Sequence, residues 1–250
     1  MRNPIIVLWT TPRSRSTAFE RMMIERGDHT VLDEPFSARY YFSSERRSLR
    51  YDVEEPESTG GRVLERILSE AELAPVFVKD MAYHATGLLS GEFLSHFTNT
   101  FLIREPEATL TSFARKWPDF TDEEAGFSAL GQAYDLTREE HGTPVVLDGD
   151  ELASQPARMI DQWCRAVGIP FLPEALTWQP GMVPEWSRWQ DWYSGVAESS
   201  GFVAPQVRPG RGRPATEPGA EARAVLSERA GVLSDAREVY RRLAESRLTP

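Results

Sequence analysis

The sequence predicts a three-layer α/β protein, in which a central parallel sheet of about five strands lies between two layers of helices. Short apolar runs of strand length alternate along the chain with segments of helical periodicity. A regular alternation of strand and helix favours parallel strands joined by right-handed crossovers. The length of 250 residues suits one sizeable domain, or one domain with an appendage.

Each predicted element rests on its own local pattern. Apolar runs next to polar or turn residues define the predicted strands, which cover residues 5–9, 29–32, 75–78, 99–103 and 144–148. Helical spacing of apolar residues, together with a proline that suits the first turn of the fourth helix, defines helices over residues 17–26, 62–73, 92–97, 106–117, 123–140 and 155–167. No internal repeat is present.

Composition narrows the possible partners. A net charge of −10 argues against general nucleic-acid binding. The opening apolar run is too short for a signal peptide, and no other run reaches the length of a membrane span. The single cysteine, Cys164, excludes an internal disulfide and fits a reducing compartment. We therefore expect a soluble cytoplasmic protein with no membrane partner.

The loop after the first strand carries the strongest functional signal. It places two arginines and three hydroxyls in one short turn before a helix, where backbone N–H groups and the helix dipole attract an anion. Thr17 and Glu20 have capping-box spacing, so the helix should begin near Ser16 or Thr17. The loop is not a Walker A loop, because it lacks glycine and lysine. We interpret it as a cradle for a phosphate or phosphosulfate, against the alternative of an ordinary turn with surface arginines; its residues are Arg13, Ser14, Arg15, Ser16 and Thr17.

Ionisable residues also follow the second and third predicted strands. Open α/β sheets bind ligands at the carboxyl ends of their strands, so these side chains are candidates for a site. Glu34 is either a ligand-facing carboxylate or a helix N-cap. His84 is either a general base or a structural polar anchor, and Lys79 ends an apolar strand.

Arg104 ends the fourth predicted strand, and Ser112 lies two turns into the helix that follows. Both side chains can reach an anion at the edge of the sheet, although Arg104 alone could equally form a surface ion pair.

In the last third of the chain, the alternation of strand and helix patterns gives way to a Trp-rich segment and a Gly/Pro-rich segment. We assign residues 1–204 to the α/β domain, with a Trp-rich segment at 176–202 in which Trp186, Trp189 and Tyr193 share one helical face. This face packs in the core or walls a ligand site. Residues 205–218 form a basic Gly/Pro loop whose Arg211 and Arg213 could fold over an anion. Residues 219–250 are expected to form one helix packed on the same domain.

These segments resemble the sulfotransferase family, which uses 3′-phosphoadenosine-5′-phosphosulfate (PAPS). Residues 11–17 look like the family's 5′-phosphosulfate loop, commonly P-[RK]-S-G-[ST]-[ST], with Arg15 where glycine is usual. Residues 101–106 and Ser112 are similar to its 3′-phosphate motif. Glu34-Pro35 resembles the Glu-Pro of bacterial carbohydrate sulfotransferases, whose glutamate is the expected base. The resemblance covers residues 5–148 and implies a P-loop-like fold.

The resemblance also implies roles. PAPS is the donor, adenosine 3′,5′-bisphosphate (PAP) the product, and no metal is needed. Arg13 neutralises charge on the departing phosphate, and the loop hydroxyls with backbone N–H groups hold the 5′-phosphate. Arg104 and Ser112 grip the 3′-phosphate, with Arg211 or Arg213 as helpers. A final set of residues would act on the acceptor and the transferring group: Glu34 as base, His84 as the second candidate for the base, and Lys79 on the sulfuryl group.

The expected acceptor is the hydroxyl, or less favourably the amine, of a small molecule, and the protein is a monomer or homodimer. A P-loop kinase is the main alternative, which the missing Walker lysine and the absence of an acid at the fourth strand end oppose. A second alternative is a non-catalytic module that binds an adenosine phosphate. A pyridoxal-phosphate enzyme would have only Lys79 in its support.

Overall fold

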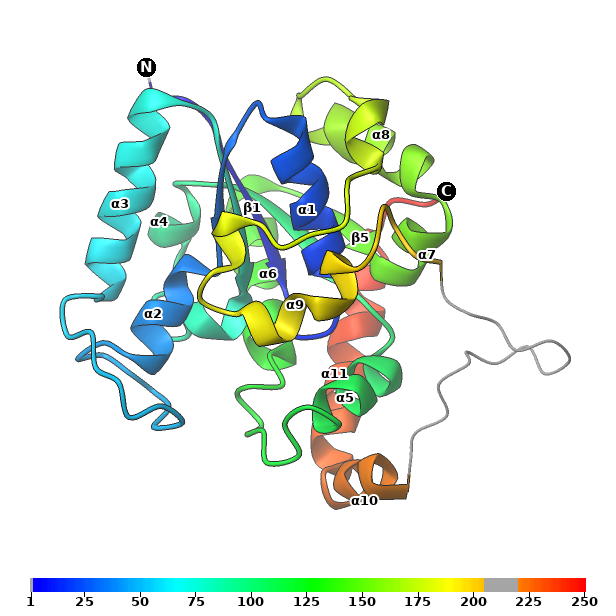
Figure 1. Ribbon diagram of the computed structural model, residues 1–250. Helices are drawn as coiled ribbons and strands as arrows, with labels where there is room; N and C mark the ends of the chain where they lie inside the picture. Colours follow the sequence, from blue (N-terminus) through cyan, green and yellow to red (C-terminus); the bar gives the residue numbers. More distant parts are fainter. Residues whose placement is uncertain (1, 205–219) are drawn as a thin grey trace, which may run out of the picture.

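The computed structural model describes residues 2–204 and 220–250, and its core is one parallel sheet of five strands in the order β2-β3-β1-β4-β5 (Figure 1). All four neighbouring pairs are parallel. The predicted fold class is confirmed. The strands are β1 (Ile5–Thr10), β2 (Thr30–Asp33), β3 (Val76–Met81), β4 (Thr98–Ile103) and β5 (Val145–Asp148).

Each face of the sheet carries its own hydrophobic core, as the alternation of side chains in a strand requires. Along β1, Ile5, Val7 and Trp9 belong to one core, whereas Ile6 and Leu8 belong to the other. All five are buried, so β1 is the central strand that both helical layers cover.

The helices divide between the two faces (Figure 1). One face is covered by α1 (Ser16–Arg26), α7 (Gly149–Ser154) and α8 (Pro156–Val167). The other is covered by α2 (Pro35–Tyr41), α3 (Gly60–Leu73), α4 (Gly91–Leu94), α6 (Phe127–His141) and α11 (Ala230–Ala244). The remaining helices, together with three short 3-10 turns, are α5 (Pro106–Ala114), α9 (Gln190–Ala197), α10 (Ala220–Glu228), η1 (Ala82–Ala85), η2 (Pro173–Leu176) and η3 (Pro184–Trp186).

Helix α1 begins at Ser16, as predicted, but two other local predictions are wrong, and each concerns a charged side chain that is buried. Strand β3 continues to Met81, so Lys79 lies inside the strand instead of beyond it. The capping box does not form: Arg15 is the N-cap residue, no side chain caps the helix, and Glu20 is fully buried. Glu20 instead accepts a hydrogen bond from the indole of Trp186 (3.2 Å).

The C-terminal third also differs from the prediction. The single terminal helix is broken at Arg229 into α10 and α11. After α11 the chain runs beside β5, where the Leu248 N–H donates to the Val146 carbonyl (2.8 Å). Trp186 lies in η3 and Tyr193 in α9, so the aromatic residues of this segment do not share one helix. No helix in the described part of the chain is long and apolar enough to cross a membrane.

Candidate active site

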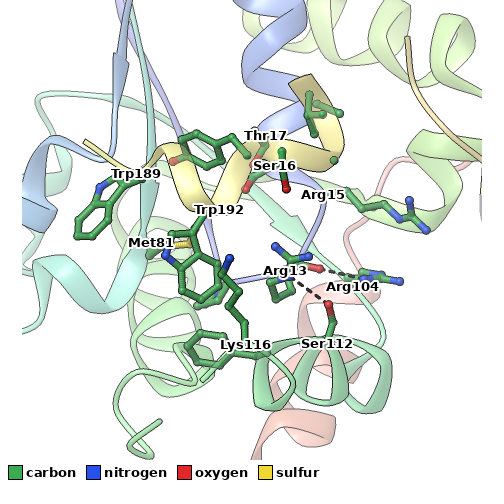
Figure 2. A pocket seen from close by; sticks show the side chains of 18 of the residues that line it. Arg13, Arg15, Ser16, Thr17, Met81, Arg104, Ser112, Lys116, Trp189 and Trp192 are labelled. Atoms are coloured by element: carbon green, nitrogen blue, oxygen red, sulfur yellow. Dashed lines mark hydrogen bonds between the residues drawn. The ribbon is translucent and has the colours of Figure 1, made fainter. Parts of the chain in front are cut away.

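A pocket of about 540 Å³ opens at the carboxyl edge of the sheet (Figure 2). Parallel strands end at this edge, where open α/β sheets bind ligands. The loop after β1, the ends of β2, β3 and β4, helix α5 and the segment from Trp189 to Val203 all contribute to its walls. The pocket is therefore assembled from stretches that are distant in the sequence.

The loop after β1 forms one wall of the pocket. Helix α1 begins at Ser16, and Ser16 and Thr17 both line the pocket. The N-terminus of a helix presents free N–H groups to an anion. The hydroxyl of Ser14 is buried and hydrogen-bonded to that of Thr10, so Ser14 supports the loop from inside.

Backbone strain is concentrated at this edge. In the described part of the chain, the non-glycine residues with positive φ are Arg13 (65°), Arg15 (77°) and Glu34 (45°). A non-glycine residue in this region costs on the order of 1–3 kcal/mol, and such strain gathers at functional sites. Arg15 adopts the left-handed conformation that glycine takes readily.

The loop after β1 and the pair Arg104 and Ser112, which were predicted separately to bind anions, are in direct contact. Arg13 Nε donates to Ser112 Oγ (3.0 Å), and Arg104 Nη1 donates to the Arg13 carbonyl (2.9 Å). Figure 2 shows these three side chains together on one side of the pocket. Burial, followed by repulsion from Arg104, lowers the pKa of Arg13. An anion between the two guanidinium groups would relieve both effects.

An acid that the prediction missed ties two of the arginines together. Asp150 Oδ1 accepts from Arg15 Nε (2.8 Å) and from Arg104 Nε (3.2 Å). Asp150 lies in the first turn of α7, directly after β5. Gly149 beside it approaches the loop so closely that a Cβ would lie 2.3 Å from the Ser14 carbonyl oxygen. The acidic turn after a fifth strand was the signal in the sequence.

Lys79 is fully buried beneath the pocket instead of facing it. Its Nζ donates to Asp33 Oδ1 (2.6 Å), Glu34 Oε1 (2.6 Å) and the Tyr193 hydroxyl (3.1 Å). Glu20 lies 3.6 Å away. All three N–H bonds of the ammonium group are thus engaged. Lys79 holds Glu34 in place, and it is not among the residues that line the pocket.

The protonation of this cluster differs between its carboxyl groups. Burial alone would raise the pKa of Glu34, but Lys79, His84 and Tyr193 outweigh burial and lower it. Burial raises the pKa of Asp33 to about 6 despite the same lysine. Burial and the neighbouring carboxylates raise the pKa of Glu20 well above its usual range.

His84 lines the pocket and is held through one of its ring nitrogens. Its Nδ1 lies 2.7 Å from Asp80 Oδ1, and Asp80 also accepts from the Phe36 N–H (2.8 Å). The buried Nε2 has no hydrogen-bond partner within the described residues. A carboxylate on Nδ1 favours the tautomer whose Nε2 accepts a proton or a hydrogen bond.

Aromatic side chains form the rest of the pocket, opposite Arg104 (Figure 2). The hydroxyls of Tyr41 and Tyr83 hydrogen-bond each other (2.8 Å), and the Lys116 ammonium lies 5.2 Å from the ring centre of Trp192. The prediction missed Lys116 as a lining residue. The aromatic residues that line the pocket are Tyr41, Tyr83, Phe113, Trp117, Trp189, Trp192, Tyr193 and Phe202. No group of three or more potential metal-ligating side chains occurs in residues 2–204 and 220–250. Arg211 and Arg213 lie outside the described residues.

The fold and the pocket define a parallel α/β protein with a cationic, partly aromatic cavity at the carboxyl edge of its sheet. The family follows from comparison with known proteins. A family model described as a sulfotransferase domain matches residues 4–212. The chain therefore belongs to the sulfotransferase domain family, as the motifs predicted.

The individual relatives share 30% or less of their sequence with this chain. The chain is 30% identical over 211 residues to two Arabidopsis thaliana proteins, "Branched-chain-amino-acid aminotransferase-like protein 2" and "protein 1". The match covers 82% of this chain but only 37% and 38% of those proteins. Among solved structures, the "Sulfotransferase Domain from the Curacin Biosynthetic Pathway" shows 13% identity, covers 92% of this chain and 99% of that chain, and has a TM-score of 0.46. The "Sulfotransferase Domain from the Synechococcus PCC 7002 Olefin Synthase" shows 14% identity, covers 92% and 96%, and has a TM-score of 0.47.

Proposed function

We propose that this chain transfers the sulfuryl group of PAPS to a hydroxyl group, less favourably an amine, of a small-molecule acceptor. The observation that supports it most is that Arg13, Arg104 and Ser112 meet at one side of a pocket that also contains Glu34. An anionic donor and a proton acceptor can therefore share one cavity. Family membership supports sulfuryl transfer as the reaction class.

The donor would lie across the loop and α5. Backbone N–H groups at the start of α1, with Ser16 and Thr17, would hold the 5′-phosphate. Arg104 and Ser112 would bind the 3′-phosphate. Arg13 spans the space between them, so its charge would stabilise the phosphate that leaves in an in-line displacement.

The acceptor would occupy the aromatic half of the pocket. Glu34 lines the same pocket, and its Oε1 is held by Lys79 and Tyr193, which leaves Oε2 to take the proton of the attacking hydroxyl. His84 packs against the rings of Tyr41 and Tyr83, and it is the second candidate for the base. Since sulfuryl transfer resembles phosphoryl transfer, positioning and charge neutralisation would supply most of the acceleration.

Glu34→Gln tests whether the site is catalytic. We expect the variant to keep its affinity for PAP while the transfer of ³⁵S from PAPS to a panel of phenols, alcohols and amines falls at least about 100-fold, the usual size of a general-base effect. Glu72→Gln, a change at an exposed helix residue, is the matched control. His84→Gln is run beside them. A Glu34→Gln variant as active as the wild type, with His84→Gln inactive, would transfer the role of base to His84. No transfer from PAPS by the wild type would contradict the proposed reaction.

A further inference from the structure

The hydroxyl of Tyr193 connects two carboxyl groups beneath the pocket. It lies 2.9 and 2.8 Å from the two carboxylate oxygens of Asp33 and 3.1 Å from Glu34 Oε1. Lys79 Nζ donates to the same phenolic oxygen (3.1 Å). A tyrosine hydroxyl has one proton to donate and lone pairs to accept with, so it can link a protonated group to an ionised one.

The two carboxyl groups differ in their access to the pocket. Glu34 lines the cavity, whereas Asp33 does not line it and its side chain is only 1% exposed. An acceptor in the pocket can therefore give its proton to Glu34 but cannot reach Asp33. Any proton that arrives at Asp33 must come through a neighbouring group. Lys79 and Tyr193 both touch the two carboxyl groups. The Lys79 ammonium has no lone pair to accept a proton, whereas the Tyr193 hydroxyl can accept one proton while it donates its own.

The two groups also differ in their affinity for a proton. Lys79, His84 and Tyr193 together outweigh burial and lower the pKa of Glu34, which makes it a poor final site for the proton. Burial raises the pKa of Asp33 to about 6, although Lys79 and Tyr193 act against burial. The transfer of a proton from Glu34 to Asp33 therefore lowers the free energy.

We propose that Asp33 is the final proton acceptor of the reaction and that Tyr193 passes the proton to it from Glu34. The inference rests on the proposed function, with Glu34 as the first base. The acceptor hydroxyl loses its proton to Glu34 Oε2 as its oxygen forms the bond to sulfur and the bond from sulfur to the donor phosphate breaks. The Glu34 carboxyl group then turns about its Cγ–Cδ bond. Its proton moves to the Tyr193 oxygen, while the Tyr193 proton moves to Asp33.

The surrounding charges fit this direction of transfer. Lys79 from β3 faces both carboxyl groups, and its own pKa is raised because attraction to Asp33, Glu20 and Glu34 outweighs its burial. Glu20 from α1 also faces Lys79, and burial raises its pKa well above the usual range. Attraction to His84 also helps to lower the pKa of Glu34. Burial raises the pKa of Asp33 to about 6, and the proton that Asp33 takes leaves Glu34 ionised for the next acceptor.

The order of protonation is measurable without an acceptor. Carboxyl ¹³C resonances of the wild type, labelled at Asp and Glu, are followed from pH 4 to 8 and assigned by their loss in Asp33→Asn and Glu34→Gln. We expect the Asp33 resonance to titrate near pH 6 and the Glu34 resonance to titrate below it. If Glu34 titrates at the higher pH, the proton would stay on Glu34 and the inference is wrong.

Kinetics test the role of Tyr193 itself. With PAPS and the acceptor found for the wild type, Tyr193→Phe should lower kcat at least tenfold and shift the acidic limb of its pH profile, with PAP affinity unchanged. Tyr134→Phe, which removes a buried hydroxyl bonded to Ser246, is the matched control. An unchanged kcat and pH profile in Tyr193→Phe would overturn the relay. Failure of the wild type to bind PAP would instead overturn the proposed function, and the order of titration would be unaffected.

Discussion

Lys79→Met should destabilise the protein strongly at neutral pH. The substitution keeps most of the side-chain length but removes the one cation among Glu20, Asp33 and Glu34, which lies within 2.6 to 3.6 Å of each of them. Removing one partner of a buried ion pair costs about 3–5 kcal/mol, because the remaining charge stays buried and unpaired. That is a large share of the roughly 5–15 kcal/mol that holds an ordinary domain together.

The loss should depend on pH with a definite sign. Without Lys79 the pKa of Asp33, already raised to about 6 by burial, rises further, and the pKa of Glu34 loses the main influence that lowers it. A group whose pKa in the folded state exceeds its unfolded value contributes stability below the unfolded pKa and loses it as the pH rises through the folded pKa. The deficit of Lys79→Met should therefore be smaller near pH 4 than near pH 8.

Urea unfolding at pH 4.5 and pH 8 measures both quantities. Lys116→Met, the same change at an exposed lysine, serves as the matched control and should shift the unfolding free energy by less than about 0.5 kcal/mol. A deficit for Lys79→Met below about 1 kcal/mol at pH 8, or one of equal size at both pH values, would refute the buried cluster as described.

Two further predictions follow from close packing, one beside the pocket and one in the hydrophobic core. Gly149→Ala should weaken PAP binding at least tenfold in calorimetry, because its Cβ would lie 2.3 Å from the Ser14 carbonyl oxygen, whereas Gly61→Ala meets no atom within 4 Å and should bind normally. Equal affinities would show that the loop tolerates displacement. Cys164 should not react with a thiol reagent in the native protein at pH 8, because it is buried and burial raises its pKa to about 11. Fast native-state labelling would contradict this packing.

The five strands and their parallel arrangement could be predicted from the sequence, because each strand is a local apolar run. The residues at which the strands end were harder to predict. Strand β3 was predicted to stop at Val78, since Lys79 breaks the apolar pattern, but the sheet continues because Lys79 is neutralised by carboxylates from other segments. Those partners are set by the tertiary structure, and no local pattern reveals them.

In the candidate site too, the residues of local motifs could be predicted, whereas those placed by tertiary contacts could not. Local motifs identified Arg13, Arg104 and Ser112, and the structure brings them into contact. Asp150 and Lys116 were missed, since neither belongs to a motif. Tyr193 was recognised only as one aromatic residue of a helical face. Its hydroxyl meets Asp33, which precedes it by 160 residues, and such a contact depends on how α9 packs against the strand ends.

Calorimetric titration with PAP and AMP, on the wild type and on Arg104→Ala, tests donor recognition most directly. PAP should bind the wild type more tightly than AMP, because Arg104 and Ser112 would contact the phosphate that AMP lacks. A hydrogen bond to a charged group is worth about 1.5–3 kcal/mol, so Arg104→Ala should remove roughly 10- to 150-fold of that preference. Arg165→Ala, at an exposed arginine of α8, should leave it intact. If PAP binds no better than AMP, if the preference survives in Arg104→Ala, or if ATP with Mg²⁺ binds more tightly, PAPS is not the donor.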